Sequence, residues 1–383
     1  MQSLRAGKES DIYMYIMYKN TPVLHWDWNA KVSNILSSDY LPFSLRSDSF
    51  GYTYNTEDIL FFLSERTAHL AMCRLLHGRN LKNFVNIDDP GATICIFADI
   101  AMLFNGISLT DSYWCKKDDS DITWENVNLR NSSGAILHSV KLPDINFESS
   151  VLYESGHQSM EFVDELKNRD IIKTSTPWRY EGDVLYLYKT RSQEPDSINK
   201  EICVSKLLDC FNVNHAVYKK CHIYNSANTM CKSRVIVLDT YDMIYPRDVR
   251  SYCERTGKDY VDFVMTIDKD NFAKLNVISY LIGNNDLSEE NYAFLMDIKS
   301  GQLVGLCPFF DYGSAFCEYN TKPNTIKSCI YGREEKTLKE VAYEMIDHCE
   351  LLNIKPIKRK MFLTDLQYET FMHRLQEMGI KMI

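Results

Sequence analysis

The sequence lacks the features that mark several classes of protein. Its 12 cysteines include no C-x-x-C pair, and no cysteines and histidines fall at the spacing of a zinc site. No run reaches the roughly 18 apolar residues that cross a bilayer, and residues 1–20 contain no uninterrupted apolar core of a signal peptide. We therefore expect a soluble, cytoplasmic protein whose reduced cysteines pack as small hydrophobic residues.

Positive charge is also scarce. The chain has 43 Lys and Arg against 52 Asp and Glu, a formal net charge of -9. Proteins that bind nucleic acid usually carry a basic face, whereas the one basic cluster here is the short stretch KPIKRK at 355–360. We expect no direct binding to nucleic acid and none to a membrane.

What is present suits a globular protein of two or three domains, with 383 residues, 45% hydrophobic and 25% charged. Residues 1–150 are expected to form an accessory β-rich or mixed domain. Its alternating segment 12–48 breaks at Asn20-Thr21-Pro22 and predicts a hairpin, and 57–77 has helical periodicity. The run KKDDSD at 116–121 is interpreted as a solvated loop, because it lacks the glycine and ligand spacing of a calcium loop.

The second half opens with a strand and a helix that each carry a charge on an apolar face. In RYEGDVLYLYKT a turn at 181–183 precedes a strand that ends in Lys189. A helix predicted to begin at Asp196 or Ser197 has Glu201 on its apolar stripe. A glutamate turned toward the protein needs a cation, and Lys189 is the nearest candidate by sequence.

Further along the chain, Asp286 and Asn291 enclose four residues, and Asp311 stands before Tyr-Gly. Taken singly, Asp286 can be a turn former, Asn291 a turn cap and Asp311 a structural partner. In this order, after a lysine strand and an acidic helix, they match the parts of kinase phosphoryl transfer. Magnesium requires hard oxygen ligands that converge, and short loops between buried strands hold such ligands firmly.

YLIGNNDLSEENYAFLMDIKSGQL and PFFDYGSAF, with GDVLYLYKT and the helix after it, resemble the HipA-like kinases of bacteria, relatives of toxin–antitoxin kinase toxins. The resemblance covers about 170–316. It implies an α+β, bilobal protein-kinase-like fold with a helical C-terminal lobe, and ATP and Mg²⁺ as cofactors. It also implies that Asp286 is the catalytic base, that Asn291 and Asp311 are magnesium ligands, and that Lys189, positioned by Glu201, contacts the ATP phosphates.

Two features depart from the family. The catalytic loop carries Ser288, Glu289 and Glu290, and two carboxylates beside the base would repel the γ-phosphate unless they face solvent or bind a cation. The stretch RDIIKTSTPW at 169–178 lacks the glycines of a phosphate loop. The family's loop can carry an inhibitory phosphoserine, so Thr174, Ser175 and Thr176 are hypothetical phosphorylation sites, and Ser175 and Thr176 are expected beside the nucleotide.

The sequence as a whole predicts a HipA-like serine/threonine protein kinase with a toxin or regulatory role and an antitoxin-like partner. The expected kinase N-lobe is 151–235, with an adenine-binding hinge within 229–239, and the expected C-lobe is 236–383, where Asp270 is expected to cap a helix. One alternative is a pseudokinase that works as a nucleotide-binding or protein-interaction module, and another is a small-molecule kinase.

Overall fold

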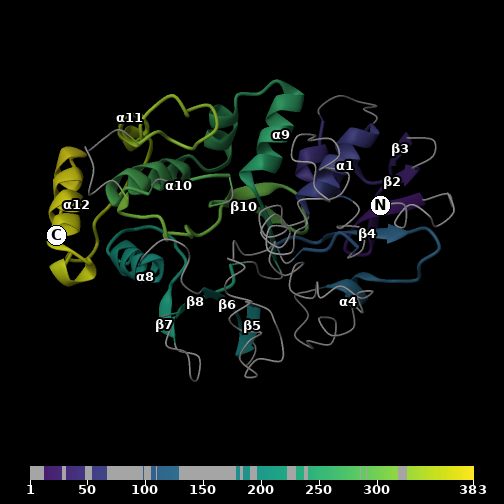
Figure 1. The fold of residues 1–383 in the computed structure, drawn as a ribbon. Helices are drawn as coiled ribbons and strands as arrows, with labels where there is room; N and C mark the ends of the chain where they lie inside the picture. The colour runs from purple at the N-terminus through teal and green to yellow at the C-terminus, as the bar shows by residue number, and fades with distance from the viewer. Residues whose placement is uncertain are drawn as a thin grey trace, which may run out of the picture. The chain divides into compact units, whose positions relative to one another are not determined.

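Alternating apolar strands and amphipathic helices give this chain a mixed α+β architecture (Figure 1), as predicted. The structure is a computed structural model and describes residues 13–27, 32–47, 54–66, 98, 105–108, 110–128, 178–181, 184–189, 196–221, 230–236, 240–284, 286–289, 291–317 and 326–383. It divides into two compact units, 1–160 and 161–383, which we describe separately. The predicted boundaries at 150 and 235 stay predictions, and Thr174, Ser175 and Thr176 lie outside the described residues.

The first unit contains an antiparallel sheet of strand order β3-β2-β1-β4. Its strands are β1 (Tyr13–Tyr18), β2 (Thr21–Asp27), β3 (Val32–Ile35) and β4 (Tyr113–Lys117). The hairpin predicted at residues 20–22 is confirmed as the β1–β2 pair, with Lys19 in the turn at φ 50°. Short 3-10 helices cover Ser38–Tyr40 and Phe43–Leu45, and the remaining helices are α1 (Thr56–Glu65) and α4 (Trp124–Val127).

A buried ion pair joins α1 to β4. Arg66, just beyond α1, donates from Nη1 and Nη2 to the two carboxylate oxygens of Asp111, at 2.9 and 2.7 Å. Arg66 Nη2 also donates to the backbone oxygen of Tyr113 at 2.8 Å. A bidentate pair of this kind satisfies both charges away from water. The part of the predicted helix 57–77 beyond residue 66 lies outside the described residues.

The second unit opens with an antiparallel sheet of strand order β5-β6-β8-β7. Its strands are β5 (Trp178–Glu181), β6 (Val184–Lys189), β7 (Lys219–Cys221) and β8 (Met230–Arg234). Helix α8 (Ser197–Leu208) follows β6 and begins at the predicted residue. Its buried side chains include Glu201, Val204, Leu207 and Leu208, the stripe expected from the sequence.

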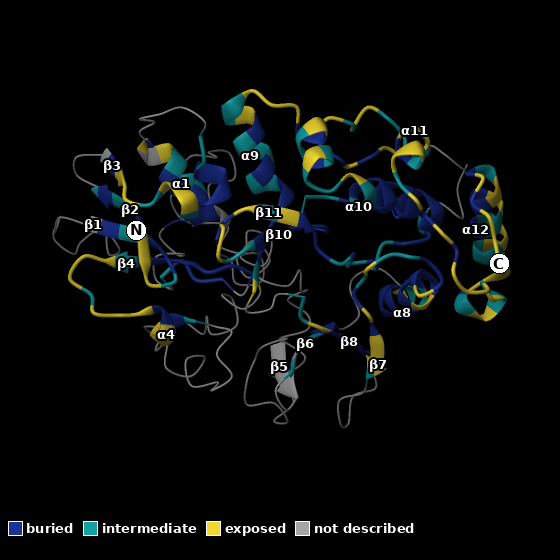
Figure 2. Cartoon of the chain, turned by 180° about the vertical axis from the view of Figure 1, so that it is seen from behind, coloured by how far each residue is buried: buried dark blue, intermediate teal, exposed yellow. Residues whose placement is uncertain are grey.

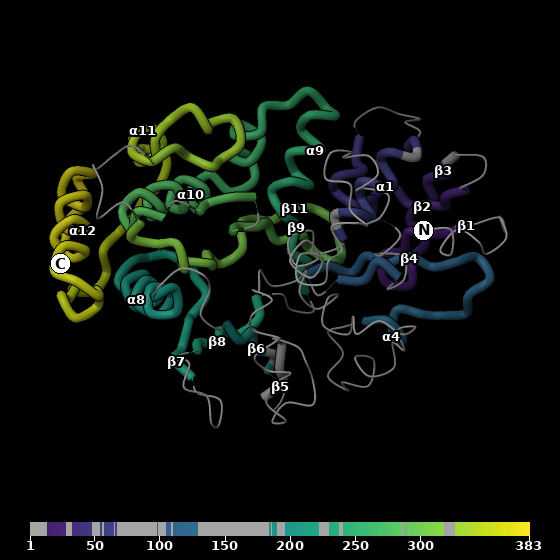
Figure 3. Tube along the Cα trace, in the orientation of Figure 1, coloured from purple at the N-terminus to yellow at the C-terminus, as the bar shows by residue number. Residues whose placement is uncertain are grey.

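A smaller sheet and most of the helices form the rest of this unit. The sheet has the order β11-β10-β9, with strands β9 (Tyr241–Ile244), β10 (Phe294–Asp297) and β11 (Leu303–Leu306). The trace in Figure 3 runs from β9 directly into α9. The helices are α9 (Pro246–Thr256), α10 (Tyr260–Ile282), α11 (Leu338–Met345) and α12 (Asp365–Glu377), with 3-10 turns at Ile346–His348 and Arg359–Met361.

Helix α10 is the central helix of this unit. Every residue from Phe272 to Ile282 is buried, seen as the dark stretch of α10 in Figure 2. Apolar residues on all sides indicate a helix surrounded by protein. None of the described helices is long and apolar enough to cross a membrane.

The prediction that Asp270 is the N-cap of the helix that buries Phe272 is wrong by two residues, because Asp268 caps the second part of α10. Asp268 interrupts α10 with φ -154° and ψ 77°, and its Oδ1 accepts from the backbone N–H of Asn271 at 3.2 Å. Its Oδ2 accepts from the backbone N–H of Leu306 at 2.9 Å, which ties α10 to β11. Asp270 instead forms an ion pair with Lys274 at 2.7 Å. Either aspartate satisfies the sequence preference for a helix cap, so the pattern could not choose between them.

Candidate active site

Lys189 lies at the end of β6, buried between two carboxylates. Its Nζ lies 2.5 Å from Oε1 of Glu201 on α8 and 3.0 Å from Oδ1 of Asp311. A strand lysine thus meets a helix glutamate twelve residues further along the chain and an aspartate from a distant loop. The pairing follows from local structure, because the lysine ends the inward face of β6 and the glutamate lies on the inward face of α8.

The loop after β11 is held to this pair through its backbone. The backbone N–H of Tyr312 donates to Oε2 of Glu201 at 3.0 Å, and the backbone N–H of Asp311 donates to the hydroxyl of Tyr218 at 3.3 Å. Lys189 Nζ lies 5.1 Å from the centre of the Tyr218 ring, within cation–π range. Asp311 has φ 61°, a left-handed conformation that a non-glycine residue adopts at some cost. The surrounding contacts therefore fix the direction of its carboxylate.

The charges in this cluster do not balance. Burial raises the pKa of Glu201 to about 7, opposed by Lys189 and assisted by Asp311. Burial lowers the pKa of Lys189, but Asp311 and Glu201 outweigh it and hold that pKa well above its usual range. When Glu201 is ionised, one ammonium group faces two carboxylates in a setting with little water, and this excess negative charge favours a second cation nearby.

The raised pKa of Glu201 has a consequence for stability. The unfolded carboxyl ionises near pH 4.5 and the folded one near pH 7, so between these values the folded state binds more protons. The free energy of unfolding should therefore fall as pH rises from about 4.5 to 7, by at most about 3 kcal/mol. Urea titrations across this range should show a weaker pH dependence in Glu201→Gln. Equal slopes in parent and variant would show that Glu201 titrates normally.

The loop between α10 and β10 carries Asp286 and Asn291, which differ in their exposure to solvent. Helix α10 stops at Gly283, whose φ is 58°. Asn284 Oδ1 then accepts from the backbone N–H of Asp286 at 3.3 Å, and Asn291 Nδ2 donates to the backbone oxygen of Asp286 at 2.5 Å. The Asp286 residue is exposed and Asn291 is buried. The two residues predicted from the spacing are thus linked through the Asp286 backbone.

Glu289, one of the two carboxylates expected to repel the γ-phosphate, has a cationic partner. Arg250 on α9 forms an ion pair with Glu289, its Nη1 lying 2.6 Å from Oε1, and its guanidinium lies 5.3 Å from the centre of the Tyr331 ring. The negative charge of Glu289 is therefore compensated by a residue outside the loop. Glu290 lies outside the described residues.

A magnesium ion bound with a nucleotide fits the residues present. Asn291 and Asp311, the predicted ligands, supply a carboxamide and a carboxylate, and among the described residues no donor binds the Asn291 carboxamide oxygen. No group of three or more His, Cys, Asp or Glu within the described ranges could hold a metal by itself. Magnesium bound with a nucleotide commonly takes one or two protein ligands, and phosphates and water complete its coordination. The roles assigned to Lys189, Glu201, Asp286, Asn291 and Asp311 stay predictions.

Sequence reasoning missed two side chains of this site. Tyr218 precedes β7 and Arg250 lies on α9, and neither belongs to a spaced motif. Burial raises the pKa of the Tyr218 hydroxyl, which therefore stays neutral. The chain contains 24 tyrosines, so composition could not single out this one.

Comparison with solved structures identifies the fold. The chain is similar to HipA in a Shewanella oneidensis HipA, HipB and operator DNA complex, with TM-score 0.53 and 10% identity over 96% of this chain and 98% of that one. It also matches the Helicobacter pylori proinflammatory kinase CtkA, with TM-score 0.39 and 14% identity over 53% of this chain and 89% of that one. No family model and no curated protein matches the sequence. The chain has a HipA-like kinase fold, as the resemblance implied.

Proposed function

We propose that this protein is an ATP- and magnesium-dependent kinase that transfers the γ-phosphate to a serine or threonine hydroxyl of a protein. The observation that carries the proposal is the contact of Lys189 with Glu201 and Asp311, at 2.5 and 3.0 Å. A buried lysine held by a helix glutamate beside a metal-binding aspartate is the arrangement that protein kinases use to orient ATP. The HipA-like fold supports the same proposal, that the protein is a kinase.

Each residue has a defined part in the proposed reaction. Lys189 binds the phosphates of the nucleotide, and Glu201 orients that lysine. Asn291 and Asp311 would hold magnesium, which supplies positive charge to the phosphate oxygens. Asp286 accepts the proton of the acceptor hydroxyl. At the same time the hydroxyl oxygen bonds to the γ-phosphorus, and the bond from that phosphorus to the β–γ bridging oxygen breaks, which releases ADP.

The adenine-binding hinge is proposed for the segment after β8. Val235 and Ile236 pack against a buried cluster that includes Tyr245 and Cys307. An apolar shelf of this kind suits an adenine ring.

The direct test is incubation of the purified protein with magnesium and γ-labelled ATP, following label on protein and release of ADP. Labelled protein or ADP that the parent produces and that Asp286→Ala and Asp311→Ala do not produce would establish the kinase activity. Magnesium-dependent nucleotide binding without turnover would instead establish a pseudokinase. Neither binding nor turnover would mean that the carboxylates are structural.

Arg250 offers a finer test of the catalytic loop. In Arg250→Gln, Glu289 loses its ion pair with Arg250, and its less compensated charge should oppose the γ-phosphate. We expect kcat to fall about tenfold, since a like charge a few ångströms away costs on the order of 1–2 kcal/mol in a partly solvated site. The matched variant Arg250→Gln/Glu289→Gln should recover most of the loss. Failure of the second substitution to restore kcat would place the effect elsewhere.

We also propose an antitoxin-like protein partner, because the HipA structure that shares this fold was solved in complex with HipB and operator DNA. A small helix-turn-helix gene beside the coding sequence is expected. Co-expression of its product should shift this protein to a larger species on gel filtration. Two separate peaks would count against the partner.

A further inference from the structure

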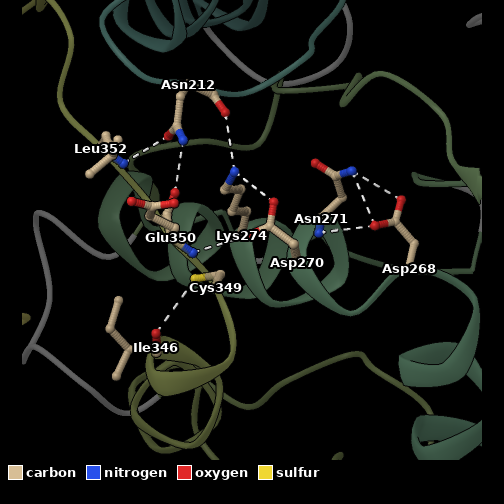
Figure 4. A network of polar contacts seen from close by, with 9 residues as sticks. All are labelled: Asn212, Asp268, Asp270, Asn271, Lys274, Ile346, Cys349, Glu350 and Leu352. Atoms are coloured by element: carbon tan, nitrogen blue, oxygen red, sulfur yellow. Dashed lines mark hydrogen bonds and ion pairs between the residues drawn. The ribbon is translucent and has the colours of Figure 1, made fainter.

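Asn212 lies in the loop that leaves the end of α8 and makes three hydrogen bonds to one distant segment, of which the two from its side chain are drawn in Figure 4. Its side-chain Nδ2 donates to the backbone oxygen of Glu350 at 2.8 Å, and its Oδ1 accepts from the backbone N–H of Leu352 at 2.7 Å. Its backbone N–H donates to the Leu352 oxygen at 3.2 Å. The segment at 350–352 is thus tied to the end of the helix that carries Glu201.

Lys274 on α10 closes these contacts into a ring. Its buried Nζ donates to the backbone oxygen of Asn212 at 3.3 Å and pairs with Asp270 Oδ2 at 2.7 Å. The other oxygen of Asp270 accepts from the backbone N–H of Glu350 at 3.0 Å. The ring therefore runs from Asn212 through Glu350, Asp270 and Lys274 back to Asn212, as Figure 4 shows. It joins the end of α8, the helix α10 and the segment after α11.

The same loop is bonded to the chain just before Asp311. The backbone N–H of Phe309 donates to the oxygen of Asn214 at 2.9 Å, and the N–H of Ala216 donates to the oxygen of Phe309 at 2.7 Å. Phe309 stands two residues before Asp311. A displacement of this loop would consequently move both carboxylates that contact Lys189.

We infer that Asn212 and Lys274 are positioning residues that hold α8 and the Asp311 loop in register, so that Glu201 stays on Lys189 and on the N–H of Tyr312. The inference rests on the proposed function only for its effect on turnover. Its physical basis is that a misplacement of about 1 Å in a catalytic constellation can cost about a hundredfold in rate. Hydrogen bonds that use all four polar groups of one asparagine leave its loop little freedom.

Hydrogen exchange on the full chain, measured by mass spectrometry of peptides, tests the positioning role and does not require the protein to be an active kinase. In Asn212→Ala, amides in α8 and at Tyr312 should exchange at least about tenfold faster. Two controls are matched to it. Asn199→Ala removes an exposed hydrogen bond from the Asn199 side chain on α8 to Asp196. Val341→Ala opens a cavity beneath α11, because the Val341 side chain is buried, with 1% exposed. Neither should speed exchange at Tyr312.

Faster exchange confined to 349–354, or equal changes at Tyr312 in Val341→Ala, would overturn the inference. Lys274→Met, which removes both contacts of the Lys274 ammonium in the ring, should give the same pattern and serves if Asn212→Ala does not fold. If the parent transfers phosphate, Asn212→Ala should lower kcat/KM for ATP about tenfold, whereas Asn199→Ala should not. If the parent transfers none, the proposed function fails, and the exchange at Tyr312 still decides the positioning role.

Discussion

Replacing Asp286 by asparagine should lower kcat about a thousandfold and leave the melting temperature within about 2 °C of the parent. The amide cannot accept the proton of the acceptor hydroxyl, whereas general-base catalysis contributes about 10²- to 10⁴-fold. Stability should hardly change, because Asp286 is exposed and its hydrogen bonds to Asn284 and Asn291 use backbone groups that the variant keeps. Initial rates of ADP release at saturating ATP, together with thermal unfolding, measure both quantities.

Nucleotide affinity supplies the control for this variant. Asp286→Asn should bind magnesium and ATP as the parent does, because the residues assigned to phosphate and metal are untouched. A matched surface change, Glu369→Gln, alters an exposed carboxylate on α12 and should leave kcat within about twofold. Parent-like turnover by Asp286→Asn would remove Asp286 from the proposed base position.

The parts of the site that lie on regular elements could be predicted from the sequence. The apolar stripe of α8 and the alternation of β6 fix which side of each element Glu201 and Lys189 occupy, and both face inward in the structure. The roles of Asp286, Asn291 and Asp311 follow only from their order along the chain and stay predictions.

What the sequence could not supply are contacts between segments that no periodicity connects. Arg250 on α9 reaches Glu289 in the loop after α10, and Asn212 reaches Leu352 across 140 residues. Asp268 rather than Asp270 caps the second half of α10 because its carboxylate also accepts from Leu306 on β11. In each case a tertiary partner selects among residues that are locally equivalent, so only the folded chain distinguishes them.

Lys189→Met should lower the rate of transfer by about 10²- to 10³-fold and destabilise the protein. Loss of a cation aimed at the phosphates costs about 10²- to 10³-fold in kcat. Removal of the lysine also leaves Glu201, with a side chain 3% exposed, and Asp311, at 20%, without the ammonium group that compensates them. Breaking a buried pair in this way typically costs about 3–5 kcal/mol, and the lower figure is expected here because Asp311 retains some solvent.

The pH dependence of that loss separates electrostatics from packing. Lys189 lowers the pKa of Glu201, so in Lys189→Met this pKa rises further and the folded carboxyl keeps its proton to higher pH. The part of the penalty that comes from Glu201 is therefore small near pH 5, where this carboxyl is neutral, and grows as pH rises toward 8, whereas the part from Asp311 stays. The double variant Lys189→Met/Glu201→Gln should regain most of the stability at pH 8 and none of the transfer. A stability loss in Lys189→Met that is the same at pH 5 and pH 8 would instead assign the effect to lost packing, and Lys189 would then lack the electrostatic role on which the phosphate-binding proposal depends.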